Sequence, residues 1–129
     1  MNKLEKDSVI GISALLVHAA KIDEIYSEHE KDLVKSFIKS YLEDSDINET
    51  LKKAEEIESN SNQLLNFTNI IKQNSMEIKK DIIEHLWKVI ISDNTVDQYE
   101  SNLMRRICGL IYFSDKECAE VKLKLLNSK

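Results

Sequence analysis

Val9-Ile-Gly-Ile-Ser-Ala-Leu-Leu-Val-His-Ala-Ala20 is an apolar run broken by one ionisable residue, His18. At 12 residues it is far shorter than the roughly 20 that a membrane-spanning helix requires. Glu5 and Asp7 cancel the two lysines that precede it, whereas a signal peptide begins with net positive charge. A similar run, Ile82-Ile-Glu-His-Leu-Trp-Lys-Val-Ile-Ile91, follows in mid-chain. We therefore expect two core helices, no cleaved signal, no stable membrane insertion and a cytoplasmic location.

The composition favours an all-α protein. Proline is absent and glycine occurs twice, which is too little of both for the tight turns of an all-β domain. Hydrophobic residues make up 42% of the chain, too many for a disordered tail. Eighteen Lys and Arg against 23 Asp and Glu give a net charge of −5, which argues against nucleic acid as a partner. The length of 129 residues fits a single domain, 1–129, with its core at about 8–126.

Apolar residues recur at helical spacing along nearly the whole chain, and the strict alternation typical of strands does not occur. Because the connections are short, consecutive helices are expected to pack as neighbours in one compact bundle. From Lys52 to Asn62 only Ala54 and Ile57 are expected to point inward, which predicts a loosely packed elbow between two halves. The seven expected helices span about 7–22, 28–42, 47–58, 61–72, 75–92, 98–112 and 115–126.

Capping boxes mark most of the expected helix starts. In such a box a Ser, Asp or Asn side chain accepts a hydrogen bond from an amide in the first turn. A Glu three residues later reaches back to the amide of the cap residue. The five expected boxes are Ser27 with Glu30, Asp46 with Glu49, Asn74 with Glu77, Asp97 with Glu100, and Ser114 with Glu117.

A shift of 70 residues aligns the first expected helix pair with the fifth and sixth helices. Five of the 34 aligned pairs, from 9/79 to 42/112, are identical. Three identities lie on the inward apolar stripes, and two are acidic residues at the same place in each interhelical turn. This predicts an internal helix-pair repeat. The identical pairs are Ile12 with Ile82, Leu16 with Leu86, Asp23 with Asp93, Glu30 with Glu100, and Leu33 with Leu103.

The two corresponding turns are Asp23-Glu-Ile-Tyr-Ser-Glu-His-Glu30 and Asp93-Asn-Thr-Val-Asp-Gln-Tyr-Glu100. Capping explains each closing Glu. It explains Asp23 and Asp93 poorly. Each is expected at the C-terminal end of the preceding helix, where its carboxylate faces the negative end of the helix dipole. Two interpretations stay open: turn chemistry alone, or a site for calcium, magnesium or manganese, which prefer oxygen ligands. The candidate metal-ligating residues are Asp23, Glu30, Asp93, Asp97 and Glu100.

Neither turn is an EF-hand, since Asp to Glu spans eight residues rather than twelve and the central glycine is missing. If the two halves of the chain pack about a pseudo-twofold axis, the turns converge into one acidic patch.

With the segments that lead into them, Leu15-Leu-Val-His-Ala-Ala-Lys-Ile-Asp23 and Leu86-Trp-Lys-Val-Ile-Ile-Ser-Asp93, these turns resemble the TerB-like family. That family comprises the small all-helical tellurite-resistance domain and its bacterial relatives. The resemblance covers about Ser8 to Leu126 and includes Arg105-Arg106-Ile107 and Phe113-Ser-Asp115. The chain departs from the family pattern after each Asp, where Glu24 and Asn94 replace glycine. Glu adopts a left-handed backbone at more cost than Asn, so the first turn is expected to differ in shape.

The resemblance implies a seven-helix bundle, divalent-metal binding by clustered acids, and a role in metal-stress or surface-sensing complexes. On this basis we expect a non-enzymatic accessory or scaffold domain that binds a partner protein. A divalent cation at the acidic turns is the possible cofactor, and no catalytic residue is assigned. The alternatives are a purely structural helical adaptor without ligand, and a metal-assisted hydrolase that uses clustered carboxylates.

The remaining reactive residues are expected to serve structure. His18 and His85 lie on or beside apolar helix faces, where a hydrogen-bonded core or rim histidine is the expected role. Trp87 is the only tryptophan and is expected in the core. Cys108 and Cys118 fall in different expected helices without the spacing of a zinc or redox motif, so we expect buried free thiols.

Overall fold

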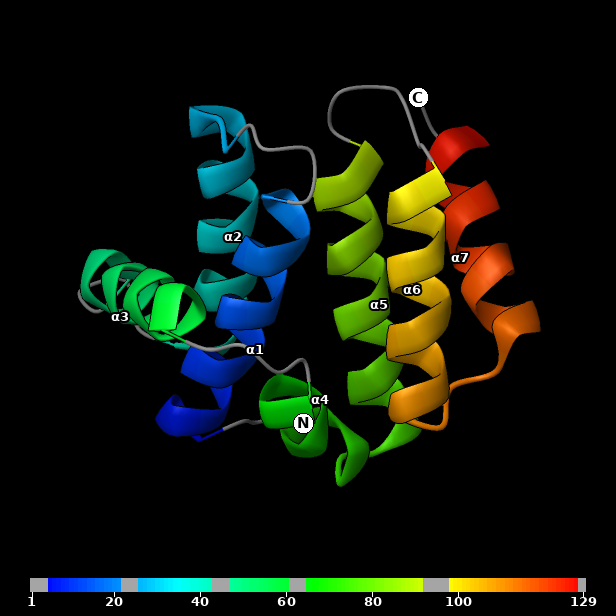
Figure 1. The fold of residues 1–129 in the computed structure, drawn as a ribbon, viewed down its shortest axis with the longest axis horizontal. Coiled ribbons are helices and arrows are strands. Elements are labelled where there is room, and N and C mark those ends of the chain that lie inside the picture. Colours follow the sequence, from blue (N-terminus) through cyan, green and yellow to red (C-terminus); the bar gives the residue numbers. More distant parts are fainter. Residues whose placement is uncertain (1–4, 22–25, 43–46, 61–64, 92–97, 128–129) are drawn as a thin grey trace.

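The computed structural model describes residues 5–21, 26–42, 47–60, 65–91 and 98–127, and over these residues the chain forms seven α-helices and no strand (Figure 1). This confirms the predicted all-α bundle. The helices begin and end close to the predicted positions, because the caps and apolar spacing from which they were predicted are local properties of the chain. Their bounds are α1 Lys6–Ala20, α2 Glu28–Tyr41, α3 Ile47–Asn60, α4 Leu65–Lys72, α5 Met76–Ile91, α6 Gln98–Leu110 and α7 Asp115–Asn127.

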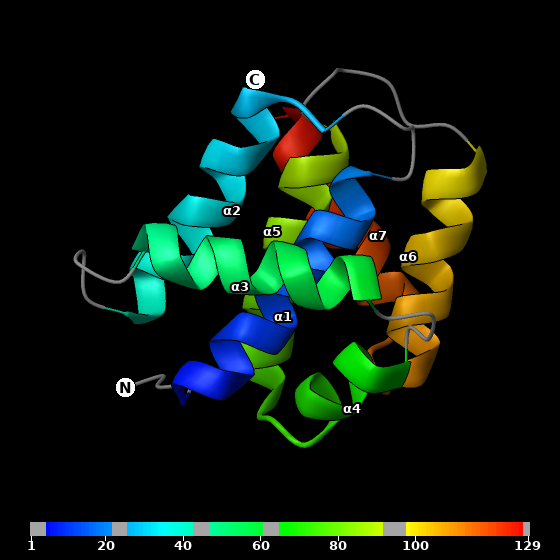
Figure 2. The same ribbon diagram turned by 60° about the vertical axis from the view of Figure 1, so that its left-hand side comes forward.

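Helix α1 lies at the centre of the bundle. All its residues from Val9 to Ala20 are buried except His18, and it packs against α2, α3, α4 and α5. Figure 2 shows α3 crossing α1 on the outside. At Gly11 the absence of a Cβ lets α4 come close, since a Cβ there would collide with Cδ1 of Ile70. The apolar run from Val9 to Ala20 therefore lies in a core helix that four other helices surround.

Helix α5 is the second core helix and packs against α1, α2, α4 and α7. Its buried residues include Ile82, Leu86 and Ile90, which lie on one face. The side chain of Trp87 is 4% exposed, as expected for a core tryptophan. Among the described residues, no helix has the length and apolar character needed to cross a membrane.

Two of the predicted capping interactions are present. Ser27 and Glu30 form a complete box at the start of α2. Ser114 Oγ accepts a hydrogen bond from the amide of Glu117 at 3.1 Å at the start of α7. The prediction for Asn74 is wrong: Ser75 caps α5, and Asn74 Nδ2 instead donates to a carbonyl near the end of α4 at 2.7 Å. Asp46 and Asp97 lie outside the described residues.

A tight turn joins α6 to α7. The amide of Phe113 donates to the carbonyl of Cys108 at 2.8 Å, and the amide of Tyr112 lies 3.4 Å from the carbonyl of Gly109. These are the two bonds of a Schellman motif, with Tyr112 in the left-handed position at φ 59°. Phe113 follows and is buried, which anchors the turn to the core. The turn therefore fixes the direction in which α7 returns along α6.

Helix α3 corrects one prediction. The segment from Lys52 onward was expected to be a loose elbow with Ala54 and Ile57 inward, but α3 continues to Asn60 and packs along α1 and α2. Its buried residues are Thr50, Leu51 and Ala54, whereas Ile57 is 42% exposed. Of the two residues expected to point inward, Ala54 is buried and Ile57 is not, because the face of α3 that packs against α1 and α2 does not cover Ile57.

Truncation of Leu51 tests this packing. We expect Leu51→Ala to lower the free energy of unfolding by about 2–4 kcal/mol, as is usual for a buried leucine. Ile57→Ala, in the same helix, is the matched control and should cost less than about 1 kcal/mol because the side chain is already in contact with water. Urea denaturation of both variants measures this. Equal losses would contradict the packing of α3.

Candidate functional site

The five acidic residues predicted as metal ligands are only partly described by the structure. Asp23, Asp93 and Asp97 lie outside the described residues. Glu100 lies in α6, but its side chain is not among those described. Glu30 lies in the first turn of α2 and is 7% exposed. The metal site therefore remains a prediction, and Glu30 is the residue whose geometry bears on it.

Glu30 closes the cap of α2. Its Oε1 accepts hydrogen bonds from the Ser27 amide at 2.9 Å and from Ser27 Oγ at 3.2 Å. In return Ser27 Oγ accepts a hydrogen bond from the Glu30 amide at 3.1 Å. This reciprocal bonding satisfies amides that the start of a helix leaves without a partner. Capping thus accounts for Glu30, as expected from its spacing to Ser27.

The helix ends that flank the two acidic turns lie at the same end of the molecule. In Figures 1 and 2 the last turns of α1 and α5 and the first turns of α2 and α6 are all found at that end. Helices α1 and α5 pack against each other, so Ala20 and Ile91 end neighbouring core helices. The two turns can converge into one acidic patch only if these helix ends lie at the same end of the molecule, and they do. Helix ends at opposite ends of the molecule would have excluded such a patch.

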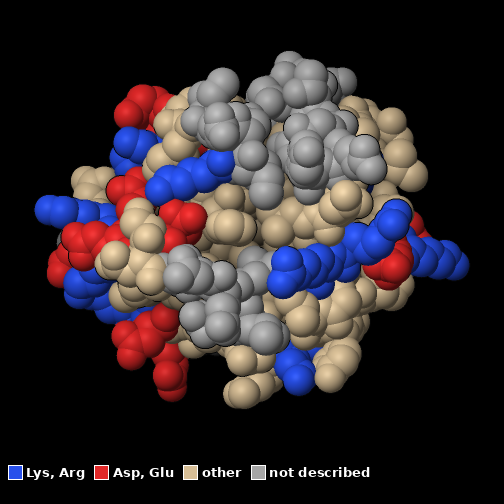
Figure 3. All heavy atoms as spheres, in the orientation of Figure 1, with Lys and Arg blue, Asp and Glu red and all other residues tan. Residues whose placement is uncertain are grey.

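A cluster of charged side chains joins α1 to α3 beside this end. Lys21 Nζ donates to Glu58 Oε1 at 2.8 Å, and His18 Nδ1 lies 3.3 Å from Glu58 Oε2. The Glu58 side chain is 11% exposed, which reduces the screening of both interactions by water. Figure 3 shows acidic and basic side chains interspersed over α2 and α3. The sequence did not predict this cluster, because its partners are 37 and 40 residues apart and meet only when α3 crosses α1.

Tyr26 lies just before α2 and extends this cluster. Its hydroxyl donates to Glu55 Oε2 at 2.6 Å, and the ammonium groups of Lys21 and Lys31 lie 5.8 and 5.2 Å from the centre of its ring. Burial raises the pKa of Tyr26 above its usual range, and the bond to Glu55 raises it further because ionised Tyr26 would face a carboxylate. Tyr26 directly precedes the cap residue Ser27. Its hydroxyl also ties the start of α2 to α3.

The chemistry of the predicted donor set suits a hard divalent cation, because all five residues offer carboxylate oxygens. Among the residues that the structure describes, no three His, Cys, Asp or Glu side chains are grouped so that they could hold a metal ion. Any such site would be completed by the acids of the two turns.

Residues 10–123 match the family described as tellurite resistance protein TerB. The chain belongs to the TerB family. The match covers nearly the whole chain and confirms the resemblance seen in the two acidic turns. Neither a curated protein nor a solved structure matches in the corresponding comparisons.

A second polar cluster in this TerB-family fold ties α2 to α5. The hydroxyl of Tyr41 donates to Asp81 Oδ2 at 2.6 Å, and His85 Nδ1 lies 2.9 Å from the Asp81 carbonyl oxygen. Burial and the bond to Asp81 raise the pKa of Tyr41. Phe37 packs against the rings of both Tyr41 and His85, with ring centres 5.1 and 5.2 Å away. His85 is thus the hydrogen-bonded core histidine that was predicted.

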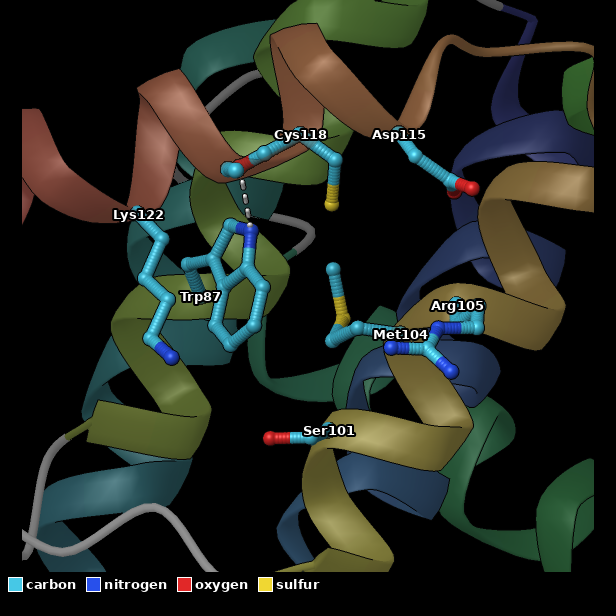
Figure 4. A pocket seen from close by; sticks show the side chains of 8 residues that line it. Trp87, Ser101, Met104, Arg105, Asp115, Cys118 and Lys122 are labelled. Atoms are coloured by element: carbon cyan, nitrogen blue, oxygen red, sulfur yellow. Dashed lines mark hydrogen bonds between the residues drawn. The ribbon is translucent and has the colours of Figure 1, made fainter.

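Helices α5, α6 and α7 of the TerB-family fold line an open pocket of about 420 Å³, which we call the Trp87 pocket (Figure 4). Trp87 Nε1 donates to the carbonyl of Cys118 at 3.2 Å, and Lys122 Nζ lies 5.3 Å from the centre of the indole. The sequence did not predict this pocket, because its walls come from three helices. Its lining includes Trp87, Met104, Arg105, Asp115, Cys118 and Lys122.

Cys108 and Cys118 are both buried free thiols, as predicted, but the fold also brings them together. The thiols of Cys108 and Cys118 lie within hydrogen-bond reach of each other, and this contact lowers the pKa of Cys118 and raises that of Cys108. Trp87 and Lys122 also lower the pKa of Cys118, against the opposing effects of burial and Asp115. The spacing of the two cysteines in the sequence carried no signal for this contact.

The ion pair between Lys21 and Glu58 predicts a measurable coupling. A double-mutant cycle with Lys21→Met and Glu58→Gln should give about 1 kcal/mol, because Glu58 is mostly buried. The Lys53–Glu49 pair, with side chains 49% and 60% exposed, is the control and should give less than about 0.5 kcal/mol. Urea denaturation supplies the four free energies of each cycle. A control coupling as large as that of Lys21 with Glu58 would contradict this assignment.

The raised pKa of Tyr26 predicts a loss of stability in alkali. Folding favours the neutral phenol, so its contribution is complete below the unfolded pKa of about 10 and is lost as the pH rises above it. We expect Tyr26→Phe to lose less stability than the wild type between about pH 9 and pH 11. Tyr112→Phe, whose parent ring is 68% exposed, should follow the wild type. Denaturant melts across this pH range measure the difference, and parallel curves for all three proteins would refute it.

Proposed function

We propose that this TerB-family chain is a non-enzymatic accessory or scaffold domain that binds a partner protein and holds a divalent cation at its acidic interhelical turns. The predicted ligands are Asp93, Asp97 and Glu100 from the second turn and Asp23 and Glu30 from the first. Calcium, magnesium and manganese are the candidate ions, because the donor set consists of carboxylate oxygens.

The observation that carries this proposal is the position of the helix ends. The last turns of α1 and α5 and the first turns of α2 and α6 lie at one end of the bundle (Figures 1 and 2). If the acids of the two turns converge at this end, their negative charges repel one another unless a cation balances them. The repeat therefore favours a shared cation over two independent capping turns.

The ion pairs and hydrogen bonds beside the first acidic turn support the proposal that this end of the bundle is the functional one. Glu55 and Glu58 of α3 are already engaged with Tyr26 and Lys21. They stabilise the end of α1 and the start of α2, so the residues between these helices connect two rigid elements. A rigid frame lowers the entropy lost when a loop binds an ion or a protein. We propose that the partner protein recognises this end in its metal-loaded form.

Titration of the chelator-treated protein with calcium, magnesium, manganese and zinc tests the metal site. By calorimetry we expect saturable binding of at least one hard cation, lost in Asp93→Asn and weakened in Asp23→Asn. Glu77→Gln is the matched control: Glu77 is an exposed acid at the start of α5, at the opposite end of that helix, and its loss should leave binding unchanged. At a metal concentration of about 100 Kd, binding should stabilise the fold by about 2.7 kcal/mol.

If calorimetry detects no heat of binding and the melting temperature is the same in every metal, the five acids serve only in capping and turn formation. The chain would then be a helical adaptor without ligand. Partner binding is tested separately by affinity purification of the wild type and Asp93→Asn, each with and without chelator, followed by quantitative mass spectrometry. A partner that depends on the metal end is lost in the variant and in chelator alike.

A further inference from the structure

The turn between α6 and α7 sets two sulfur atoms against each other. The bond from the Phe113 amide to the Cys108 carbonyl closes α6, and α7 begins two residues later. The thiols of Cys108 in α6 and Cys118 in α7 lie within hydrogen-bond reach of each other. Both cysteines are 6% exposed or less, so the contact lies inside the fold. Contact between two thiols is the first requirement for a disulfide between them.

The two cysteines differ in their access to solvent. Cys118 lines the Trp87 pocket, and Figure 4 shows its sulfur pointing into the pocket toward Met104. Cys108 is 0% exposed and is not among the residues that line the pocket. A volume of about 420 Å³ admits a small molecule such as a hydroperoxide. A reagent that enters the pocket therefore meets the Cys118 sulfur first.

The surroundings of Cys118 lower the pKa of its thiol below the ordinary value. The contact with Cys108 is the strongest cause and Trp87 and Lys122 add to it, while burial and Asp115 act in the opposite direction. The ammonium of Lys122 lies over the indole at 5.3 Å from the ring centre, at the wall of the same pocket. Reactive cysteines in proteins have this combination of access, a hydrogen-bond donor and nearby positive charge.

We propose that Cys118 is a peroxide-reactive thiol, that small hydroperoxides reach it through the Trp87 pocket, and that Cys108 resolves the product into an intramolecular disulfide. The Cys118 thiolate attacks one peroxide oxygen, so that an S–O bond forms and the O–O bond breaks. The departing oxygen takes up a proton and leaves as an alcohol, or as water from hydrogen peroxide. Sulfur is oxidised to a sulfenic acid, and the peroxide is reduced.

The Cys108 sulfur then attacks the Cys118 sulfur. The S–S bond forms, the S–O bond breaks, and hydroxide leaves as water with the proton of the Cys108 thiol. In sum, two thiols and one hydroperoxide give a disulfide, an alcohol and water. The disulfide links α6 to α7, and a dithiol reductant restores both thiols.

Treatment of the full-length wild type with hydrogen peroxide tests this chemistry. We expect the protein to stay monomeric on a non-reducing gel and to lose two hydrogens by intact mass spectrometry. Peptide mapping should find Cys108 linked to Cys118, and dithiothreitol should reverse the change. The fluorescence of Trp87, the only tryptophan, should change in step because its indole contacts Cys118.

Single variants separate the two roles. In Cys108→Ser a sulfenic acid should accumulate at Cys118 and be trapped by dimedone, whereas in Cys118→Ser the buried Cys108 should stay reduced. Lys122→Met should slow the oxidation of Cys118 several-fold. Lys124→Met, which removes the same charge from an exposed position in the same helix, should not.

Thermal melts establish that each variant is folded. The peptide mapping of the oxidised wild type does not depend on the variants, so it tests the proposal even if a variant fails to fold. The proposal is overturned if peroxide leaves both thiols alkylatable, or if Cys118 is oxidised without a bond to Cys108. It is equally overturned if the disulfide joins two chains, or if Cys108 reacts in the absence of Cys118.

Discussion

Burial of α1 is the constraint on which the rest of the structure depends. From Val9 to Ala20 the helix has only His18 partly open to water, so four other helices must cover it. Each buried apolar side chain contributes about 1.5–3 kcal/mol relative to an exposed one, so partial coverage would leave a large part of the driving force for folding unused. The chain therefore wraps α2, α3, α4 and α5 around α1, while α6 packs against α4 and α7 packs against α5 and α6.

The acidic end follows from this wrapping. Helices α1 and α5 are neighbouring core helices, and their last turns lie at the same end of the molecule. Helix α3 then crosses α1 with Glu55 and Glu58 within reach of Tyr26 and Lys21. The core thus holds the frame around the proposed metal end.

The Trp87 pocket has a different origin. It lies where α5, α6 and α7 meet, and the Schellman turn after α6 places Cys118 against Cys108. A left-handed Tyr112 costs about 1–2 kcal/mol relative to an ordinary backbone. Burial of Phe113 directly after it offsets that cost. The proposed thiol chemistry thus depends on a turn far from the acidic end, so the two proposals are physically independent.

Local chemistry made most of the helices predictable from the sequence: apolar spacing selected their buried faces, and Ser27 with Glu30 and Ser114 with Glu117 marked two of their starts. The repeat of Asp23 and Glu30 at Asp93 and Glu100 likewise selected the candidate metal residues. The prediction from sequence was wrong at the start of α5, where Asn74 and Ser75 are adjacent candidates for the cap residue. It was also wrong for Ile57, whose burial depends on how α3 packs against its neighbours. The contacts of Glu58 with Lys21 and of Cys108 with Cys118 were decided by tertiary structure alone. Such pairs carry no local signal, because only the packing of whole helices brings them within reach of a hydrogen bond.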